Sequence, residues 1–491
     1  MSVNLKILII KLQLFCIFSY LIFIITRVQF GTFDDNAMAL KILVAISVAT
    51  VLHFIQHKLI MGKLYYFSFS FLFPLGYLIV YFQLAILQVG GLSVLSQFEN
   101  FIWGGSSNVS ATISVSGLGL VAFFMGAVAK PSRYDSTQYL VPHVRALVKL
   151  ITFLSYIFYI FFLINSGSYL SGAYVDDGTP LASYASKLFD LCLFAALCIE
   201  LHRIIQSDTK RLTIMSYIAL FYQPLVLLVV IHILMSIFVG DRGPVITLSI
   251  LSFSAYFIKF YQLNFVKVLV IIVMLSTFFT ILGEARTRVL GNSFGDRLST
   301  ASETSGESEY FDESVPGSSL IELALSSRTL AVSVRDVPSE FDYQYGMFQF
   351  QQLVSIVPGA QRLINNIVYD GNPIYDGSAN FITYLIHRRS VDYGDGSSVI
   401  ADLYLDFGII GVVIVMFIFG RFISRIELDV HQRNIKLDLR FLAFMAFLSN
   451  AIYLSRSTIM LEFAGIILSY LLIKLIALFL DHRSNGRLRI S

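Results

Sequence analysis

Arginine is concentrated in one long polar stretch of the sequence, residues 284–398, in which lysine does not occur. The guanidinium group stays charged and holds phosphate oxygens through two parallel hydrogen bonds. Several such groups can hold a diphosphate; the alternative is that each pairs with an Asp or Glu of the same stretch. The arginines are Arg286, Arg288, Arg297, Arg328, Arg335, Arg362, Arg388 and Arg389. Our diphosphate-binding candidates among them are Arg286, Arg288, Arg335, Arg388 and Arg389.

Two further arginines lie in short turns between long apolar segments. Arg242 belongs to the turn GDRGP (residues 240–244), and Arg456 belongs to the turn SRST (residues 455–458). A charge held at the edge of a membrane is costly unless it has a partner. Both arginines therefore join the diphosphate-binding candidates; the alternative is that their side chains reach toward lipid phosphates.

Candidates for proton transfer surround the start of a late apolar segment. His387 precedes this segment, and an imidazole can accept a proton near neutral pH. The adjacent Arg388 and Arg389 favour the uncharged imidazole, which is the form that a base requires. Asp402 and Asp406 are four residues apart, so they share one face of a helix. Carboxylates that enter a membrane helix indicate function; the alternative for Asp402 is a helix cap or a pair with a loop arginine.

Metal-ion chemistry has weaker support in the sequence. The acidic pairs at residues 34–35 and 176–177 resemble divalent-cation motifs, but such pairs are common in loops. Nothing near His387 has the spacing of metal ligands, so we expect neither a metal site nor a cofactor. Glu462, in the last apolar segment, is a weaker candidate of the same kind as Asp402. The formal charge of +3 is small for 491 residues and argues against a nucleic-acid partner.

These side chains must be positioned by a very apolar chain. Hydrophobic residues make up 56% of the sequence and charged residues only 14%, against about 25% in soluble domains; the mean hydropathy is +0.74. Apolar stretches that can cross a bilayer, about 17 to 25 residues long, occur at residues 7–26, 38–55, 64–89, 109–129, 144–164, 184–202, 213–239, 245–261, 263–283, 399–420, 438–454 and 458–480. The predicted fold class is therefore an all-α polytopic membrane protein with about twelve transmembrane helices.

Three local features follow from the same stretches. The third stretch is long and is expected to tilt, or to break near Pro74 and Gly76, and the seventh is expected to kink at Pro224. Cysteines in apolar runs are expected to be buried thiols. They are Cys16, Cys192 and Cys198.

The basic residues of the short loops set the orientation. Loops around Lys58, Lys149, Arg211 and Arg433 are basic, whereas the alternate loops are poor in basic residues. By the positive-inside rule both termini are cytoplasmic, and residues 284–398 form one large periplasmic loop. The domains are then residues 1–283 with about nine helices, the loop 284–398, and residues 399–491 with about three helices and a cytoplasmic tail. Within the loop, residues 299–313 are acidic and are expected to be mobile, and short helices are expected in the rest.

Three patches of sequence carry a family resemblance. The first is VGDRGP (residues 239–244), the second is the large outer loop, and the third is GSS (residues 396–398) followed by ADLYLDFGIIG (residues 401–411). Together with the topology, they resemble the Wzy-type O-antigen polymerases, which polymerise repeat units of bacterial surface polysaccharide. Arg335 and Gly346 fit the Arg-x10-Gly spacing of some members. A second copy in another outer loop is absent, so the two-loop arrangement of those members is in doubt.

The resemblance implies undecaprenyl-diphosphate-linked oligosaccharides as substrates, at the periplasmic face of the bacterial inner membrane. It also implies an architecture like that of the C-type membrane glycosyltransferases, without metal or nucleotide sugar. The arginines would offset charge on the departing diphosphate. His387 would take the acceptor hydroxyl proton, with Asp402 orienting it or binding an arginine and Asp406 as the remaining candidate. The implied partners are membrane lipid, a flippase and a chain-length regulator.

Other functions stay open at this point. An O-antigen ligase would share the topology and the arginine-rich loop. A flippase or transporter for lipid-linked sugars would place charges in the middle of helices along a translocation path, whereas here the polar residues are concentrated on the outer face. A structural membrane subunit without chemistry is the least specific alternative.

Overall fold

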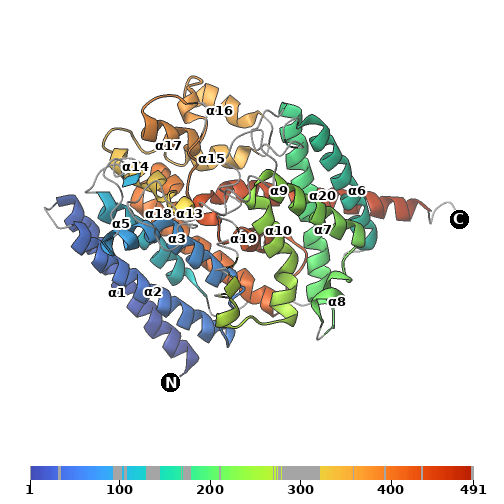
Figure 1. The fold of residues 1–491 in the computed structure, drawn as a ribbon, viewed down its shortest axis with the longest axis horizontal. Helices are drawn as coiled ribbons and strands as arrows, with labels where there is room; N and C mark the ends of the chain where they lie inside the picture. Colours follow the sequence, from blue (N-terminus) through green and yellow to red (C-terminus); the bar gives the residue numbers. More distant parts are fainter. Residues whose placement is uncertain are drawn as a thin grey trace. The chain divides into compact units, whose positions relative to one another are not determined.

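The structure is a computed structural model, and every element among its described residues is a helix (Figure 1). Eight of these helices are long and apolar enough to cross a membrane, which confirms a polytopic membrane protein. The spans are Val3–Arg27, Asn36–Met61, Phe69–Val89, Val109–Gly126, Val144–Asn165, Arg242–Phe260, Val399–His431 and Ile459–His482. The structure describes residues 2–30, 35–91, 102–103, 108–128, 144–166, 169, 179–209, 212–268, 270–271, 274, 278, 321–355, 357, 359–391, 394–432 and 435–487.

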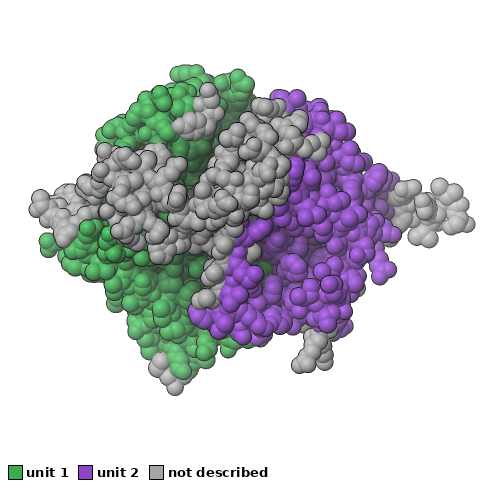
Figure 2. Space-filling view, viewed as in Figure 1, with its two compact units in different colours: residues 1–132, 306–428, 451–464 green, residues 133–305, 429–450, 465–491 purple. Residues whose placement is uncertain are grey.

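The chain forms two compact units, coloured separately in Figure 2. Unit 1 consists of residues 1–132, 306–428 and 451–464, and unit 2 of residues 133–305, 429–450 and 465–491. Two helices, α18 (Val399–His431) and α20 (Ile459–Arg487), contribute residues to both units.

Unit 1 is a bundle of apolar helices that carries a group of shorter ones. The bundle contains α1 (Val3–Phe30), α2 (Asp35–Met61), α3 (Phe69–Val89) and α5 (Val109–Gly126), which pack on one another. The shorter helices gather at one end of the bundle (Figure 1). They are α13 (Ile321–Ala324), α14 (Ser327–Asp336), α15 (Met347–Val354), α16 (Ala360–Val368), η5 (Pro373–Tyr375) and α17 (Ser378–His387). Short helices in the large loop are therefore confirmed.

Glycines allow α5 and α18 to approach closely. A Cβ at Gly126 would lie 2.3 Å from the carbonyl oxygen of Phe417, and a Cβ at Gly420 would lie 2.2 Å from that of Phe123. Small residues at such crossings let backbones make contact in membrane bundles, where packing drives association. Helix α18 is thereby fixed against the bundle along its membrane-spanning part.

Helix α18 is broken at Gly408, whose φ of 64° and ψ of −161° are not helical. The backbone N–H groups of Gln344 and Tyr345 donate to the carbonyl oxygens of Leu405 and Asp406, both at 2.9 Å. A break in a membrane helix is tolerated where other protein groups satisfy the released backbone. The break therefore attaches the loop to the first nine residues of α18.

Unit 2 is built on the paired helices α6 (Val144–Asn165) and α7 (Pro180–Gln206). Helix α10 (Arg242–Ala255) packs against α9 (Gln223–Val239), α7 and α19 (Leu439–Ser449), and it continues as the π-helical turn η3 (Tyr256–Phe260). Helices α9 and α19 are apolar but shorter than a full span. Helix α7 is long, but it carries Lys187, Asp190, Glu200 and Arg203 along its length.

Two predicted interruptions differ from the structure. Helix α3 runs without a break through Pro74, and Gly76 serves packing, since a Cβ there would lie 2.2 Å from the carbonyl oxygen of Ile452. The seventh predicted span is two helices, α8 (Ile214–Ile218) and α9, with Pro224 in the first turn of α9. Proline is favoured there because its missing N–H has no partner to lose.

Two further outcomes concern side chains and coverage. Cys192 and Cys198 are buried, as predicted, but Cys16 is exposed. The prediction for Cys16 is wrong because an apolar run that faces lipid exposes part of its residues to the outside of the protein. The ninth predicted span, 263–283, and the acidic segment 299–313 lie mostly or wholly outside the described residues.

Candidate functional site

The two aspartates of α18 connect the loop helices to the membrane helix. The carboxylate of Asp406 accepts hydrogen bonds from the backbone N–H groups of Phe348 (3.2 Å) and Gln349 (2.9 Å). These are the first N–H groups of α15, whose N-cap residue, Gly346, has no side chain to satisfy them. Asp406 therefore caps a helix of the loop from inside α18.

Asp402 is also buried and hydrogen-bonded. Its carboxylate accepts from the Gln352 side chain at 2.8 Å and from the Ser397 hydroxyl. Gln352 in turn donates to the Ser378 hydroxyl at 3.2 Å, at the start of α17. Asp402 thus joins α15, α17 and the entry to α18.

His387 has a different carboxylate partner from the one expected. Its Nε2–H donates to Oδ2 of Asp395 at 2.8 Å, and Arg328 donates to Oδ1 of the same carboxylate. The Asp395 side chain is only 4% exposed, and its backbone N–H donates to the Thr383 hydroxyl at 2.9 Å. Asp395 therefore accepts from this nitrogen, because the chain between α17 and α18 brings Asp395 back against the end of α17. That Asp402 orients His387 or binds an arginine stays a prediction.

This His–Asp–Arg group, formed by His387, Asp395 and Arg328, has a defined electrostatic arrangement. One carboxylate faces an imidazole on one oxygen and a guanidinium on the other. A carboxylate that accepts from one ring nitrogen fixes the tautomer and leaves the other nitrogen to accept a proton. It also stabilises the imidazolium that forms. The group therefore holds the imidazole ring of His387 in a fixed orientation.

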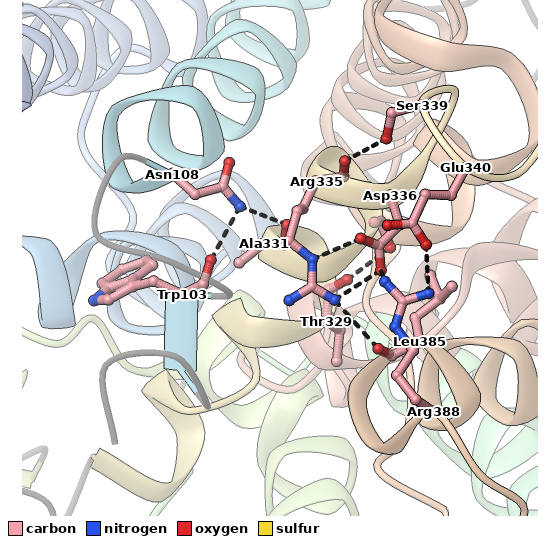
Figure 3. A network of polar contacts seen from close by, with 11 residues as sticks. Trp103, Asn108, Thr329, Ala331, Arg335, Asp336, Ser339, Glu340, Leu385 and Arg388 are labelled. Atoms are coloured by element: carbon pink, nitrogen blue, oxygen red, sulfur yellow. Dashed lines mark hydrogen bonds and ion pairs between the residues drawn. The ribbon is translucent and has the colours of Figure 1, made fainter. Parts of the chain in front are cut away.

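Arg335 and Arg388 converge on one buried carboxylate, that of Asp336 (Figure 3). Arg335 contacts both oxygens, at 2.6 and 2.8 Å, and Arg388 contacts one at 2.9 Å. Arg388 also donates to Glu340 at 2.7 Å. The hydrogen bond that Arg335 donates to Asp336, more than any other effect, raises the pKa of Arg335.

Two arginine charges are thereby balanced by two carboxylates. Arg388 lies just after α17 in the left-handed conformation, with φ of 53°, and its two carboxylates hold it in this strained position. For Arg335, Arg388 and Arg328, pairing with acidic residues of the loop is the observed state. The alternative weighed for the loop arginines therefore holds for these three.

The turn that contains Arg456 is tied to the same end of α18. The Tyr81 hydroxyl donates to the carbonyl oxygen of Ser455 at 3.0 Å and accepts from the backbone N–H of Ile400 at 3.2 Å. Two residues before Ile400, the Ser398 hydroxyl is 2.8 Å from that of Thr329, the residue after Arg328. A chain of hydrogen bonds thus runs from the Arg456 turn to the helix that carries Arg328.

The remaining predicted arginines are placed as follows. Arg389 is exposed directly after Arg388. Within the described ranges, neither Arg389 nor Arg456 takes part in an ion pair. Arg242 belongs to unit 2, where it opens α10 next to the N-cap Asp241. Arg286 and Arg288 lie outside the described residues.

Sequence reasoning missed Asp395 and Asp336 as partners of the candidate site residues. Asp395 lies in the segment GDG between two predicted elements, eight residues after His387, and its type alone gives no signal. Asp336 directly follows Arg335, which suggests a simple surface pair. Only the path of the loop between α14 and α17 shows that Asp336 also meets Arg388.

The side-chain amide of Asn108 links helix α14 to the bundle. The Asn108 side chain, just before α5, donates to the carbonyl oxygens of Trp103 at 3.0 Å and Ala331 at 2.7 Å (Figure 3). Ala331 lies on α14 between Arg328 and Arg335. Asn108 thus fixes the helix that presents both arginines.

Comparison with known proteins gives one match. The family model described as O-antigen polysaccharide polymerase Wzy matches residues 7–484, which is nearly the whole chain. No curated protein and no solved structure matches the chain. The match decides for the polymerase over the ligase and the flippase, and it fits the hydrophobic spans and the helical loop described above. The chain therefore belongs to the Wzy family of O-antigen polymerases, multi-pass inner-membrane glycosyltransferases that polymerise lipid-linked repeat units.

Proposed function

We propose that the glycosyl transfer takes place in unit 1, beside the first turns of α18. The observation that carries this proposal is the chain of hydrogen bonds that links the Arg456 turn to the His–Asp–Arg group. The donor is an undecaprenyl-diphosphate-linked chain, and the acceptor is the sugar end of a lipid-linked repeat unit. The bond between the anomeric carbon and the diphosphate breaks as the acceptor oxygen attacks that carbon.

His387 accepts the proton of the acceptor hydroxyl in this scheme. Because Nε2–H donates to Asp395, Nδ1 is the nitrogen that receives it. The diphosphate leaves with the bonding electron pair, and Arg456 and Arg389 offset its charge. Arg335 and Arg388 are already balanced by Asp336 and Glu340, so we assign them to positioning α17 next to the site.

The orientation of the chain follows the same proposal. Glu427, near the end of α18, accepts from the backbone N–H of Phe69 at 2.8 Å and from the Ser70 hydroxyl, at the start of α3. The end of α18 and the start of α3 therefore share one side of unit 1. Tyr81 and the loop helices lie toward the start of α18. We assign the side with the end of α18 to the cytoplasm, and the side with the start of α18 and the loop helices to the periplasm.

We further propose twelve crossings with both termini cytoplasmic and the domain division 1–283, 284–398 and 399–491. Helices α7, α9 and α19 fall on three predicted spans beyond the eight helices that are long and apolar enough to cross a membrane. The arrangement is like that of the C-type membrane glycosyltransferases. A flippase and a chain-length regulator are the proposed protein partners.

Topology is tested with reporter fusions. A reporter that is active only in the periplasm should work near residue 340, where the loop helices are. A reporter that is active only in the cytoplasm should work near residues 60, 137, 208 and 432. A cytoplasmic signal from the fusion near residue 340 would overturn the orientation and, with it, the location of the site.

The diphosphate assignment is tested at Arg456. Arg456→Ala is expected to lower polymerisation about 10²-fold, the size of effect seen when one donor to a developing charge is removed. Arg456→Lys should restore only part of the activity, because an ammonium group cannot form two parallel hydrogen bonds. The measurement is product-ladder formation from purified lipid-linked repeat unit in detergent.

A matched control is available on the opposite side of unit 1. Arg425 is exposed on α18 near its cytoplasmic end, so Arg425→Ala should leave the ladder unchanged. Full activity of Arg456→Ala, with the variant present in the membrane at the normal level, would show that Arg456 only anchors the turn at the lipid interface. The same test applied to Arg242→Ala asks whether the turn in unit 2 shares this role.

A further inference from the structure

A second group of polar side chains lies in unit 2 around the turn that contains Arg242. The backbone N–H of Asp241 donates to the carbonyl oxygen of Ser236 at 2.8 Å, and its carboxylate accepts from the backbone N–H of Gly243 at 3.1 Å. The Ser236 hydroxyl donates to the carbonyl oxygen of His232 at 2.9 Å. The end of α9 and the start of α10 thus hold a carboxylate and a hydroxyl in fixed positions.

Asp190 of α7 and Tyr169 face this turn. The carboxylates of Asp190 and Asp241 are close enough to repel each other, and the Asp190 side chain is exposed. The Tyr169 hydroxyl lies near the Ser236 side chain. Burial, supported by the carboxylates of Asp241 and Asp190, raises the pKa of Tyr169 to about 12. The phenol therefore stays protonated at neutral pH and can donate a hydrogen bond.

A buried hydroxyl without a partner points into the same group. Tyr159 is 3% exposed, its hydroxyl has no hydrogen-bond partner among the described residues, and it lies near the hydroxyl of Tyr169. Its ring is fixed by contacts with Phe189 at 4.6 Å and His232 at 5.4 Å. A buried hydroxyl left unpaired costs stability, so its retention beside the phenol of Tyr169, with its ring against Phe189 next to Asp190, indicates a ligand.

The chemistry of the group selects the class of ligand. Two carboxylates repel an anion, so an uncharged ligand suits these four side chains better than the diphosphate, although Arg242 lies in the same turn. In the part of the chain that the structure describes, no three acidic, histidine or cysteine side chains converge as metal ligands. Carboxylates that accept, phenols that both donate and accept, and nearby aromatic rings are suited to an uncharged molecule with many hydroxyl groups.

We propose that Asp190, Asp241, Tyr159 and Tyr169 form a binding subsite for sugar hydroxyl groups of the repeat unit. The subsite is distinct from the groups to which we assign the chemistry, all of which belong to unit 1. It goes beyond the proposed function and does not depend on it, because it concerns recognition of the sugar and not proton transfer or the leaving diphosphate. Its failure and the failure of the catalytic assignment are therefore separable.

The test uses the full-length protein in detergent and the repeat-unit oligosaccharide freed from its lipid by mild acid. Asp190→Asn keeps the shape of the side chain but removes its charge, and it is expected to weaken oligosaccharide binding about tenfold or more, since hydrogen bonds to charged groups are the strong ones. Tyr159→Phe removes only the hydroxyl and should weaken binding by a smaller factor. In polymerisation assays both variants should raise KM more than they lower kcat.

Asp208→Asn is the matched control, because Asp208 is exposed after the other end of α7, and it should bind as the unaltered protein does. Binding to Asp190→Asn equal to that of the unaltered protein would overturn the proposal. So would a fall in kcat for both variants at constant KM. If Asp190→Asn does not accumulate in the membrane, Tyr159→Phe decides alone: unchanged oligosaccharide binding then rejects the subsite.

Discussion

His387→Ala is expected to reduce chain extension about 10²- to 10⁴-fold, the range that a positioned general base contributes. We assign proton transfer to this imidazole because its orientation is fixed. Its Nε2 donates to Asp395 at 2.8 Å, and Arg328 forms an ion pair with the same carboxylate. Binding of lipid-linked substrate should persist, because the alanine removes no group that we assign to the diphosphate. The measurement is single-turnover product formation with a separate substrate-binding assay.

Asp395→Asn probes the same assignment through the orientation of the imidazole. The amide fills the same space but can donate to Nε2, which favours the wrong tautomer for proton transfer from the acceptor. We expect a lower kcat with a smaller change in KM, together with an altered pH profile. Substitution of a residue that is only structural would not change the pH profile.

Asp402→Asn is the matched comparison within the same region. Its amide oxygen can still accept from Gln352 or Ser397, the groups that Asp402 contacts, so the loss of activity should be smaller. An inactive Asp402→Asn beside an active His387→Ala would reverse the assignment. Loss of activity on addition of a chelator alone would show that the reaction requires a metal ion.

The sequence predicts the membrane helices well because hydropathy is a property of each segment by itself. Most expected spans coincide with a helix, and α18 begins at residue 399 as predicted. The positions where a predicted interruption is absent depend on the helices that pack against the segment. Pro74 is accommodated within α3, and Gly76 is retained for the close approach of the Ile452 backbone. Neither effect is visible within one segment.

The pairing of charges could not be predicted in the same way. The sequence shows many arginines and many acids in the loop, but Asp336 and Asp395 receive their partners from α14, α17 and the chain after α17. The two partners of Asp395 lie 8 positions (His387) and 67 positions (Arg328) before it in the sequence. Such contacts depend on the path of the loop, so residue type and spacing leave the alternatives open.

The same limit applies to Asp402 and Asp406. Their position in a membrane helix predicts that they are functional, and this stays a prediction. The structure supplies their partners as backbone and side-chain groups of the loop. A buried carboxylate in this helix therefore attaches the loop helices, and this contact accounts for Asp406 without a role in proton transfer.

Gly408→Val is expected to destabilise the protein strongly and to abolish polymerisation. Gly408 has φ of 64°, and a Cβ there would lie 3.0 Å from the Tyr343 ring. With ψ of −161° this backbone conformation is essentially limited to glycine and costs another residue about 1–3 kcal/mol, and a β-branched side chain adds the clash with Tyr343. The chain can relieve both only by making α18 continuous. That change would withdraw the carbonyl groups of Leu405 and Asp406 from the loop.

The Gly408→Val substitution should also affect the proposed catalytic site, because the break in α18 positions the loop helices that carry it. Residues 344 and 345 hydrogen-bond to α18 at the break, and Asp406 caps α15 one turn away. We expect a lower apparent melting temperature in detergent and increased proteolysis within the loop, at unchanged insertion of the spans. Proteolysis separates loss of loop attachment from loss of the membrane bundle.

Gly465→Val is the matched control, since Gly465 lies on α20 with nothing within 4 Å of a Cβ built on it. Valine is a somewhat better helix former than glycine, so melting temperature and activity should remain near those of the unaltered protein. Equal behaviour of the two variants would mean that the break at Gly408 does not hold the loop. The contact of Asp406 with the first turn of α15 would then stabilise only α15 and not the attachment of the loop to α18.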